Sequence, residues 1–202
     1  YKILISYYSS IPKMQRYTLW QRCENTTLAL LEILISTSHK KGEERLAALY
    51  EMSNHLDLLK VFIRLAKEIS TWSKDPSTQI GAIVVNDSRR ILATGYNGFP
   101  RGIEDSEERL NNRQEKYSKI IHAETNALLN ALYNGVSVKD ATIYVHGLPT
   151  CSDCTKLIIQ SGIQRVVVSF DTSSVNRWSD QWNQISKPMY KEAGISISEY
   201  EI

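Results

Sequence analysis

Short apolar runs that alternate with helical patterns constrain the fold of this chain most. The runs 80–85 and 91–96 are joined by a polar turn, which predicts an antiparallel hairpin. Further runs at 142–146, 165–170 and 195–199 each follow a helical segment. Strands that alternate with helices pair in parallel through right-handed crossovers. We therefore expect an α/β protein, a three-layer α/β/α sandwich with a mixed five-stranded sheet.

Helical periodicity marks the segments around these strands. The apolar residues of the first helix recur at the spacing of one helical face: Leu58, Phe62, Leu65 and Ile69. Ser53 or Asn54 is placed to cap this helix. A polar insertion, 101–117, follows the hairpin. The later helices are expected at three ranges: 124–133, 152–161 and 178–189.

The length and the change of pattern along the chain predict one domain with an appendage. The chain has 202 residues, and its regular pattern begins just after Met52. Residues 1–51 contain one amphipathic run and no strand-like alternation. We expect them to be an N-terminal extension of unknown role that need not belong to the natural domain. The domain itself is expected to span residues 52–202.

Charge and cysteine content limit the partners and the compartment. With 24 basic and 22 acidic side chains, the net charge is +2, which gives no broad basic surface for nucleic acid or an anionic membrane. The most apolar stretch, 28–35, is far shorter than the roughly 20 residues that cross a bilayer. The 3 cysteines cannot all pair, which favours a reducing compartment. We expect a cytoplasmic protein with a small-molecule substrate, no nucleic-acid partner and no membrane partner.

Two predicted helix starts carry side chains that suit metal binding. Proteins with α/β sheets usually bind ligands at the carboxyl ends of strands, against such helix starts. His122 and Glu124 open one helix, and Cys151 and Cys154 open the next. Cysteines three apart share one side of the first turn, where the helix dipole favours thiolates. Two thiolates and one imidazole suit Zn²⁺, and three protein ligands leave a position for water. Glu124 can move protons of that water only if His122 lies at the helix entrance, because residues two apart diverge within a helix.

Each half of this pattern has another explanation. A His-x-Glu can be an ordinary helix start, and a Cys-x-x-Cys can be a redox dithiol or half of a structural zinc site. The redox interpretation leaves His122 unexplained, and a site with four thiolates lacks ligands because Cys23 lies in the extension. Since both halves occur at successive helix starts, the sequence favours a catalytic zinc site.

The motifs resemble those of the zinc-dependent cytidine and deoxycytidylate deaminases, whose signature is H-x-E followed by P-C-x-x-C. Further runs narrow the resemblance to the deoxycytidylate deaminase family. Residues 75–82 are similar to its D-P-x-x-Q-V-G-A, and residues 95–102 are similar to its G-Y-N-G-x-P-x-G. Residues 158–163 match the stretch behind its second cysteine. The resemblance covers about residues 52–202, implies the cytidine deaminase fold and leaves the extension unexplained.

The resemblance implies hydrolytic deamination of dCMP to dUMP and ammonia, which supplies dUMP for thymidylate synthesis. A zinc-activated water would attack C4 of the cytosine, and Glu124 would protonate N3 and pass a proton to the leaving amine. The metal ligands would be His122, Cys151 and Cys154. Asn97, at the end of the second strand, matches the family asparagine that holds the sugar hydroxyl, and its ordinary alternative is a turn residue.

Other substrate contacts are expected around these motifs. The candidate phosphate donors are basic side chains and backbone amides: Arg101, Lys119, Arg177, Ser77 and Thr78. Each of these taken alone is more often a solvated surface group. Ala123 is expected beside the substrate, and Phe99 or Trp178 could stack on the base. Trp178 shares its helical spacing with Trp182 and Met189, which favours core packing.

Two departures from the family pattern stand out. Thr150 separates Pro149 from Cys151, which alters the loop but not the ligand spacing. Many family members also place a cysteine after G-Y-N-G-x-P-x-G and respond to dCTP with Mg²⁺ as activator and to dTTP as inhibitor. Here Ile103 stands at that position, so these effectors and Mg²⁺ have no support in the sequence. The resemblance also implies a homo-oligomer, either a dimer or a hexamer.

Two alternatives stay open at this point. The substrate could be another cytosine nucleotide, with dCTP used beside dCMP, or a free nucleoside, whereas a tRNA adenosine is disfavoured by the net charge of +2. A protein of a different class would be an inactive zinc-stabilised module that binds a nucleotide. Glu124 argues against that module, because a structural site needs no acid beside the metal.

Overall fold

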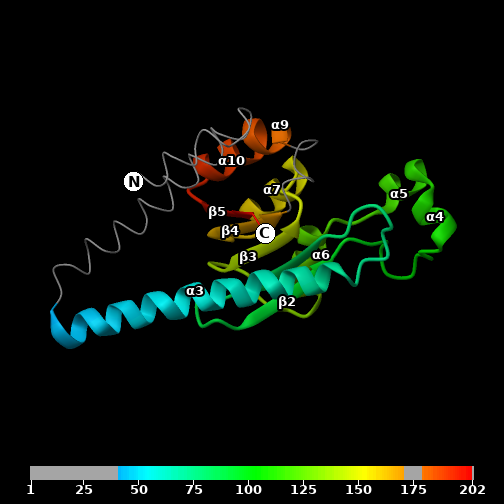
Figure 1. Cartoon of the computed structure of the whole chain (residues 1–202). Helices are drawn as coiled ribbons and strands as arrows, with labels where there is room; N and C mark the ends of the chain where they lie inside the picture. The colour runs from blue at the N-terminus through cyan, green and yellow to red at the C-terminus, as the bar shows by residue number, and fades with distance from the viewer. Residues whose placement is uncertain (1–40, 171–178, 202) are drawn as a thin grey trace, which may run out of the picture. The chain divides into compact units, whose positions relative to one another are not determined.

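A computed structural model of the chain describes residues 41–170 and 179–201 (Figure 1). The chain divides into two compact units, Tyr1–Asp57 and Leu58–Ile202. The sheet and the helices packed on it belong to the second unit. The first unit is described only from residue 41, and that part is helical from Gly42.

Helix α3 spans Gly42–Ser70, so the cap expected at Ser53 or Asn54 is wrong. Glu43 and Glu44 in the first turn favour a start at Gly42, because acidic groups stabilise the positive end of the helix dipole. No proline or glycine interrupts the segment before Ser53. The expected boundary between residues 51 and 52 falls inside this helix and stays a prediction.

The sheet has five strands in the order β2-β1-β3-β4-β5. Their bounds are β1 Gly81–Val85, β2 Ile91–Tyr96, β3 Thr142–Gly147, β4 Arg165–Phe170 and β5 Ser196–Glu201. β1 pairs antiparallel with both β2 and β3, whereas β3, β4 and β5 are parallel. The expected hairpin and mixed five-stranded sheet are therefore confirmed.

The helices after the hairpin agree with the expected order and add detail. Their bounds are α4 Glu107–Asn111, α5 Arg113–Lys119, α6 Ala123–Tyr133, α7 Ser152–Gln160, α9 Ser179–Gln181, a π-helical turn η1 Trp182–Ser186, and α10 Lys187–Glu192. The polar insertion thus contains two short helices, and the last expected helix is divided by η1. Within 41–170 and 179–201, no helix is long and apolar enough to cross a membrane.

The core lies on both faces of the sheet and makes three layers. Alternate residues of β1 enter two different clusters, with Ala82 and Val84 in one and Ile83 and Val85 in the other. The first cluster is covered by α6, α7 and the η1–α10 segment, and the second by the second half of α3. Figure 1 shows the second half of α3 on the opposite side of the strands from α7 and α10. The three-layer α/β/α arrangement is confirmed.

A close approach at Gly95 fixes the start of α6 against the sheet. A Cβ added at Gly95 of β2 would overlap the carbonyl of Ala123 and the amide of Ala127. The chain after β2 continues this contact, because Gly98 pairs with Ile121 in an isolated β-bridge. The end of β2 therefore lies directly beside the segment that leads into α6.

Candidate functional site

The two expected helix entrances are the N-termini of α6 and α7. His122 is the N-cap of α6 and has an extended backbone, with φ −70° and ψ 152°. Cys151 is the N-cap of α7, and its sulfur accepts a hydrogen bond from the Cys154 amide at 3.5 Å. Each entrance therefore presents side chains beside free helical amides, where anionic ligand atoms are stabilised.

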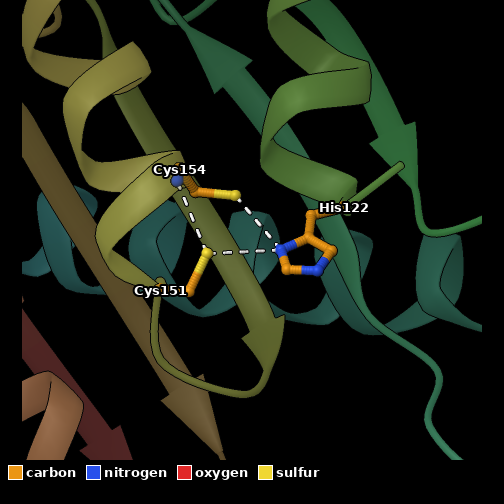
Figure 2. A group of neighbouring side chains, drawn as sticks. All are labelled: His122, Cys151 and Cys154. Atoms are coloured by element: carbon orange, nitrogen blue, oxygen red, sulfur yellow. Dashed lines mark hydrogen bonds between the residues drawn. The ribbon is translucent and has the colours of Figure 1, made fainter. Parts of the chain in front are cut away.

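The two entrances bring one imidazole and two sulfurs together (Figure 2). His122 Nδ1 lies 3.4 Å from Cys151 Sγ and 3.3 Å from Cys154 Sγ. A tetrahedral zinc ion with ordinary Zn–S and Zn–N bonds would separate nitrogen and sulfur by about 3.6 Å. The donor set and its spacing therefore fit zinc, with Nδ1 as the imidazole ligand atom.

The protonation of this cluster follows from its hydrogen bonds. The Cys154 thiol and the His122 imidazole lower the pKa of Cys151 to about 4. The same contact with Cys151 raises the pKa of Cys154. The hydrogen bond to Cys151 also raises the pKa of His122 to about 9. Zinc takes thiolates and neutral imidazole, so binding a metal here releases protons.

Glu124 is a buried carboxyl group beside the cluster. It is 3% exposed, and its Oε2 atom has no hydrogen-bond partner among the described residues. Burial raises the pKa of Glu124 to about 7. A group that must take and give protons works best with a pKa near the working pH. His122 is the N-cap, as the predicted convergence with Glu124 required, and the charge of Glu124 acts on both His122 and Cys154.

The loop before Cys151 is held by a buried network of hydroxyl groups. Thr150 is 1% exposed, and its Oγ1 lies 3.2 Å from Thr155 Oγ1 and 3.0 Å from Tyr190 Oη. Thr155 Oγ1 donates to the Cys151 carbonyl at 2.8 Å, and Ser186 Oγ donates to the Thr150 carbonyl at 2.9 Å. Thr150 thus contributes a hydroxyl group that fixes the cysteine loop, at the position where the family that the motifs resemble usually has proline.

Asn97 is buried beside the entrance of α6. Its Oδ1 accepts from the Ile80 amide at 2.8 Å, and its Nδ2 donates to the Thr78 carbonyl at 2.9 Å. The adjacent Gly98 exchanges backbone hydrogen bonds with Ile121. A carbonyl oxygen has two acceptor sites, so Asn97 Oδ1 keeps one for a further donor.

The backbone amides of Ser77 and Thr78 donate hydrogen bonds to Asp75, whose role the sequence did not indicate. The Ser77 amide donates to Asp75 Oδ1 at 2.9 Å, and the Thr78 amide does so at 3.2 Å. Asp75 is also paired with Lys116, at 3.0 Å from Nζ to Oδ1. Asp75 and Lys116 are 41 residues apart, so no local pattern pointed to their contact.

Other expected substrate residues lie outside the cluster. Arg101 donates to Asn130 Oδ1 and stacks on the Tyr133 ring, at 4.4 Å from the guanidinium carbon to the ring centroid. Asn130 is eight residues beyond His122, which is about 12 Å along a helix. Lys119 pairs with Glu115.

Of the four remaining expected residues, Phe99 and Ala123 are described by the structure. Phe99 lies beneath the Arg109 guanidinium at 5.8 Å. Ala123 is fully buried in the core. Arg177 and Trp178 lie outside the described residues.

Comparisons with known proteins agree on one family. Residues 56–170 match the model of the cytidine and deoxycytidylate deaminase zinc-binding region. The chain is 37% identical to an uncharacterized deaminase in the luxG 3′ region of Aliivibrio fischeri, over 69% of this chain and 90% of that protein. It is 33% identical to mouse deoxycytidylate deaminase, over 73% of this chain and 82% of that protein.

A solved structure gives the same result. The dCMP deaminase of the cyanophage S-TIM5, in complex with dCMP and dUMP, aligns with a TM-score of 0.57 and 25% identity. The alignment covers 71% of this chain and 96% of that one. The cluster of His122, Cys151 and Cys154 lies within residues 56–170, which the family model matches. The chain therefore belongs to the cytidine and deoxycytidylate deaminase family.

Proposed function

We propose that this chain is a zinc-dependent dCMP deaminase, which converts dCMP and water to dUMP and ammonia. The observation that carries the proposal is the His122, Cys151 and Cys154 cluster beside the buried, unpartnered carboxyl oxygen of Glu124. The choice of dCMP as substrate is supported by the similarity to mouse deoxycytidylate deaminase and to the cyanophage dCMP deaminase structure with dCMP and dUMP.

His122, Cys151 and Cys154 would hold the zinc ion. Bound there, zinc supplies Lewis-acid activation of the attacking water at neutral pH. Glu124 would accept one proton from that water and deliver it to N3 of the cytosine. It would then carry the second proton, from the new hydroxyl group on C4, to the amine, which leaves as ammonia. Its pKa of about 7 suits both directions of transfer.

The nucleotide would be oriented by groups around Asn97. The second acceptor site of Asn97 Oδ1 is available to a sugar hydroxyl, because its other contacts use Ile80 and Thr78. The amides of Ser77 and Thr78 already donate to Asp75, so a phosphate would have to share these donors. Phosphate contacts by Arg101 and Arg177 and stacking by Phe99 and Trp178 stay predictions.

Several wider expectations are not carried by the geometry of the site. A cytoplasmic location, a homo-oligomeric assembly and the absence of nucleic-acid and membrane partners stay predictions. The effectors dCTP and dTTP, and the Mg²⁺ that would accompany dCTP, form no part of the proposal.

Ammonia release by zinc-loaded protein tests the proposal with dCMP, dCTP, CMP and deoxycytidine in parallel. We expect turnover of dCMP that falls by about 10²- to 10⁴-fold in Glu124→Gln, with zinc retained at one ion per chain. Turnover of dCTP at a similar rate would make the enzyme bifunctional. Zinc-loaded protein that is inactive on all four substrates would overturn the proposal and favour a nucleotide-binding module.

A further inference from the structure

A buried ion pair joins the polar insertion to the loop before β1. Lys116, in α5, and Asp75 have side chains that are 9% and 4% exposed, with Nζ and Oδ1 3.0 Å apart. Lys116 Nζ also donates to Ser77 Oγ at 2.6 Å. Removing two charges from water is unfavourable, and such a pair is retained only when further hydrogen bonds satisfy it.

Asp75 is the centre of these further hydrogen bonds. Its Oδ1 accepts from the Ser77 amide and hydroxyl, both at 2.9 Å, and from the Thr78 amide at 3.2 Å. Its Oδ2 lies 3.4 Å from Asn97 Nδ2. Burial acts to raise the pKa of Asp75, but the hydrogen bonds from Ser77 and Lys116 outweigh it and hold this pKa below its ordinary value. Asp75 is therefore a carboxylate that organises the loop.

The contacts form a closed ring that returns to the entrance of α6. Asn97 is followed by Gly98, which exchanges backbone hydrogen bonds with Ile121 at 3.1 and 2.8 Å. Ile120 in turn donates its amide to the Lys116 carbonyl at 2.9 Å. The ring thus connects the loop at Asp75, the end of β2 and the segment that carries His122. Lys116 belongs to it through both its backbone and its ammonium group.

We propose that Lys116 is a positioning residue for the nucleotide: through Asp75 it holds Asn97 and the Ser77–Thr78 segment against the entrance of α6. The ammonium group is already bonded to Asp75 and Ser77 and is almost inaccessible, so it acts through them instead of touching the substrate. This inference rests on the proposed function, because it names the group that sets how tightly that reaction binds its nucleotide.

The first test compares Lys116→Met with Lys74→Met. Lys74 joins the same two segments through an exposed pair with Asp105, with side chains 67% and 41% exposed, and exposed pairs contribute little. We expect Lys116→Met to raise the KM for dCMP roughly ten- to hundredfold, with kcat changed by less than about threefold and zinc retained. Lys74→Met should leave KM and kcat unchanged. An unchanged KM in zinc-loaded Lys116→Met would overturn the proposal.

A second pair of variants separates positioning from stability. Lys116→Arg keeps the charge and should recover much of the lost affinity. The double variant Lys116→Met with Asp75→Asn removes both buried charges. Its free energy of unfolding should therefore exceed that of the single variant Lys116→Met, while its KM for dCMP stays as high as in that single variant. A KM that returns to the wild-type value with the regained stability would overturn the proposal.

Hydrogen exchange keeps the inference apart from the proposed function. The amides of Thr78 and Ile80 donate within the ring, to Asp75 and Asn97. Their protection should fall in Lys116→Met and hold in Lys74→Met, whatever the substrate. If the wild-type chain does not turn over dCMP, the proposed function fails, and exchange alone decides the inference. Unchanged protection at both amides would then overturn it.

Discussion

The His122, Cys151 and Cys154 cluster and the ring around Asp75 both include residues at or just before the start of α6, but their polar atoms differ. In the cluster, two sulfurs and an imidazole nitrogen converge, and the adjacent Glu124 leaves Oε2 without a partner among the described residues. In the ring, Asp75 and Asn97 use both of their side-chain oxygen or nitrogen atoms in hydrogen bonds. A buried atom without a partner needs an explanation, which the proposed proton transfer supplies for Glu124, whereas the hydrogen bonds of the ring hold its segments in place.

The largest effect is expected from a change within the cluster. Cys154→Ala removes one of three ligand atoms, so we expect loss of tightly bound zinc and a fall in dCMP turnover of roughly 10³-fold or more. Metal analysis and ammonia release measure the two effects, and circular dichroism checks the fold. If Cys154→Ala retained zinc and turned over dCMP at the normal rate, the cluster would not be the metal site, and its contrast with the ring would be lost.

A change in the ring should act first on stability. Asp75→Ala leaves Lys116 buried without its carboxylate, which costs about 3–5 kcal/mol of the free energy of unfolding. Urea unfolding measures this loss, and zinc content at low urea should stay near one ion per chain. A loss below about 1 kcal/mol would show that the pair is solvated in solution.

A third change, Thr150→Val, should affect both the free energy of unfolding and zinc binding. Thr150→Val keeps the shape of the side chain but leaves the hydroxyl of buried Tyr190 without its Thr150 partner, which costs about 1–3 kcal/mol. Because this network holds the cysteine loop, zinc affinity should also fall about 10- to 100-fold in a chelator competition. The matched control, Thr71→Val, removes an exposed threonine hydroxyl and should change neither quantity.

The smallest effect is expected from an exposed pair that connects the same segments as the ring. Asp105→Ala breaks the contact with Lys74 and should change the free energy of unfolding by less than about 1 kcal/mol. Urea unfolding beside Asp75→Ala makes the comparison direct. Equal losses in the two variants would mean that burial does not distinguish the two ion pairs.

The sheet and the cluster could be predicted because their signals are local. The strands are short apolar runs bounded by polar turns, and the residues of the cluster occupy two short motifs at helix starts. The predicted start of α3 was wrong because a capping residue such as Ser53 marks a helix start only where the helix does not already continue through it. Between Gly42 and Ser53 no proline or glycine stops the helix.

The ring and the hydroxyl network could not be predicted for a different reason. Lys116 and Asp75 are 41 residues apart, and Thr150 and Tyr190 are 40 apart. A lysine within a polar insertion has the pattern of a solvated surface charge, and a tyrosine within a helix has the pattern of a core residue. Only the assembled fold determines which distant polar groups become neighbours.

The unpartnered oxygen of Glu124 has a consequence for how such a chain tolerates change. A buried carboxyl group without full hydrogen bonding lowers the stability of the folded state. Selection for stability alone would replace it, whereas the proposed proton transfer requires it, so under that proposal the two pressures oppose each other at this one position. A screen for thermostable variants is therefore expected to enrich substitutions of Glu124 that have lost the reaction.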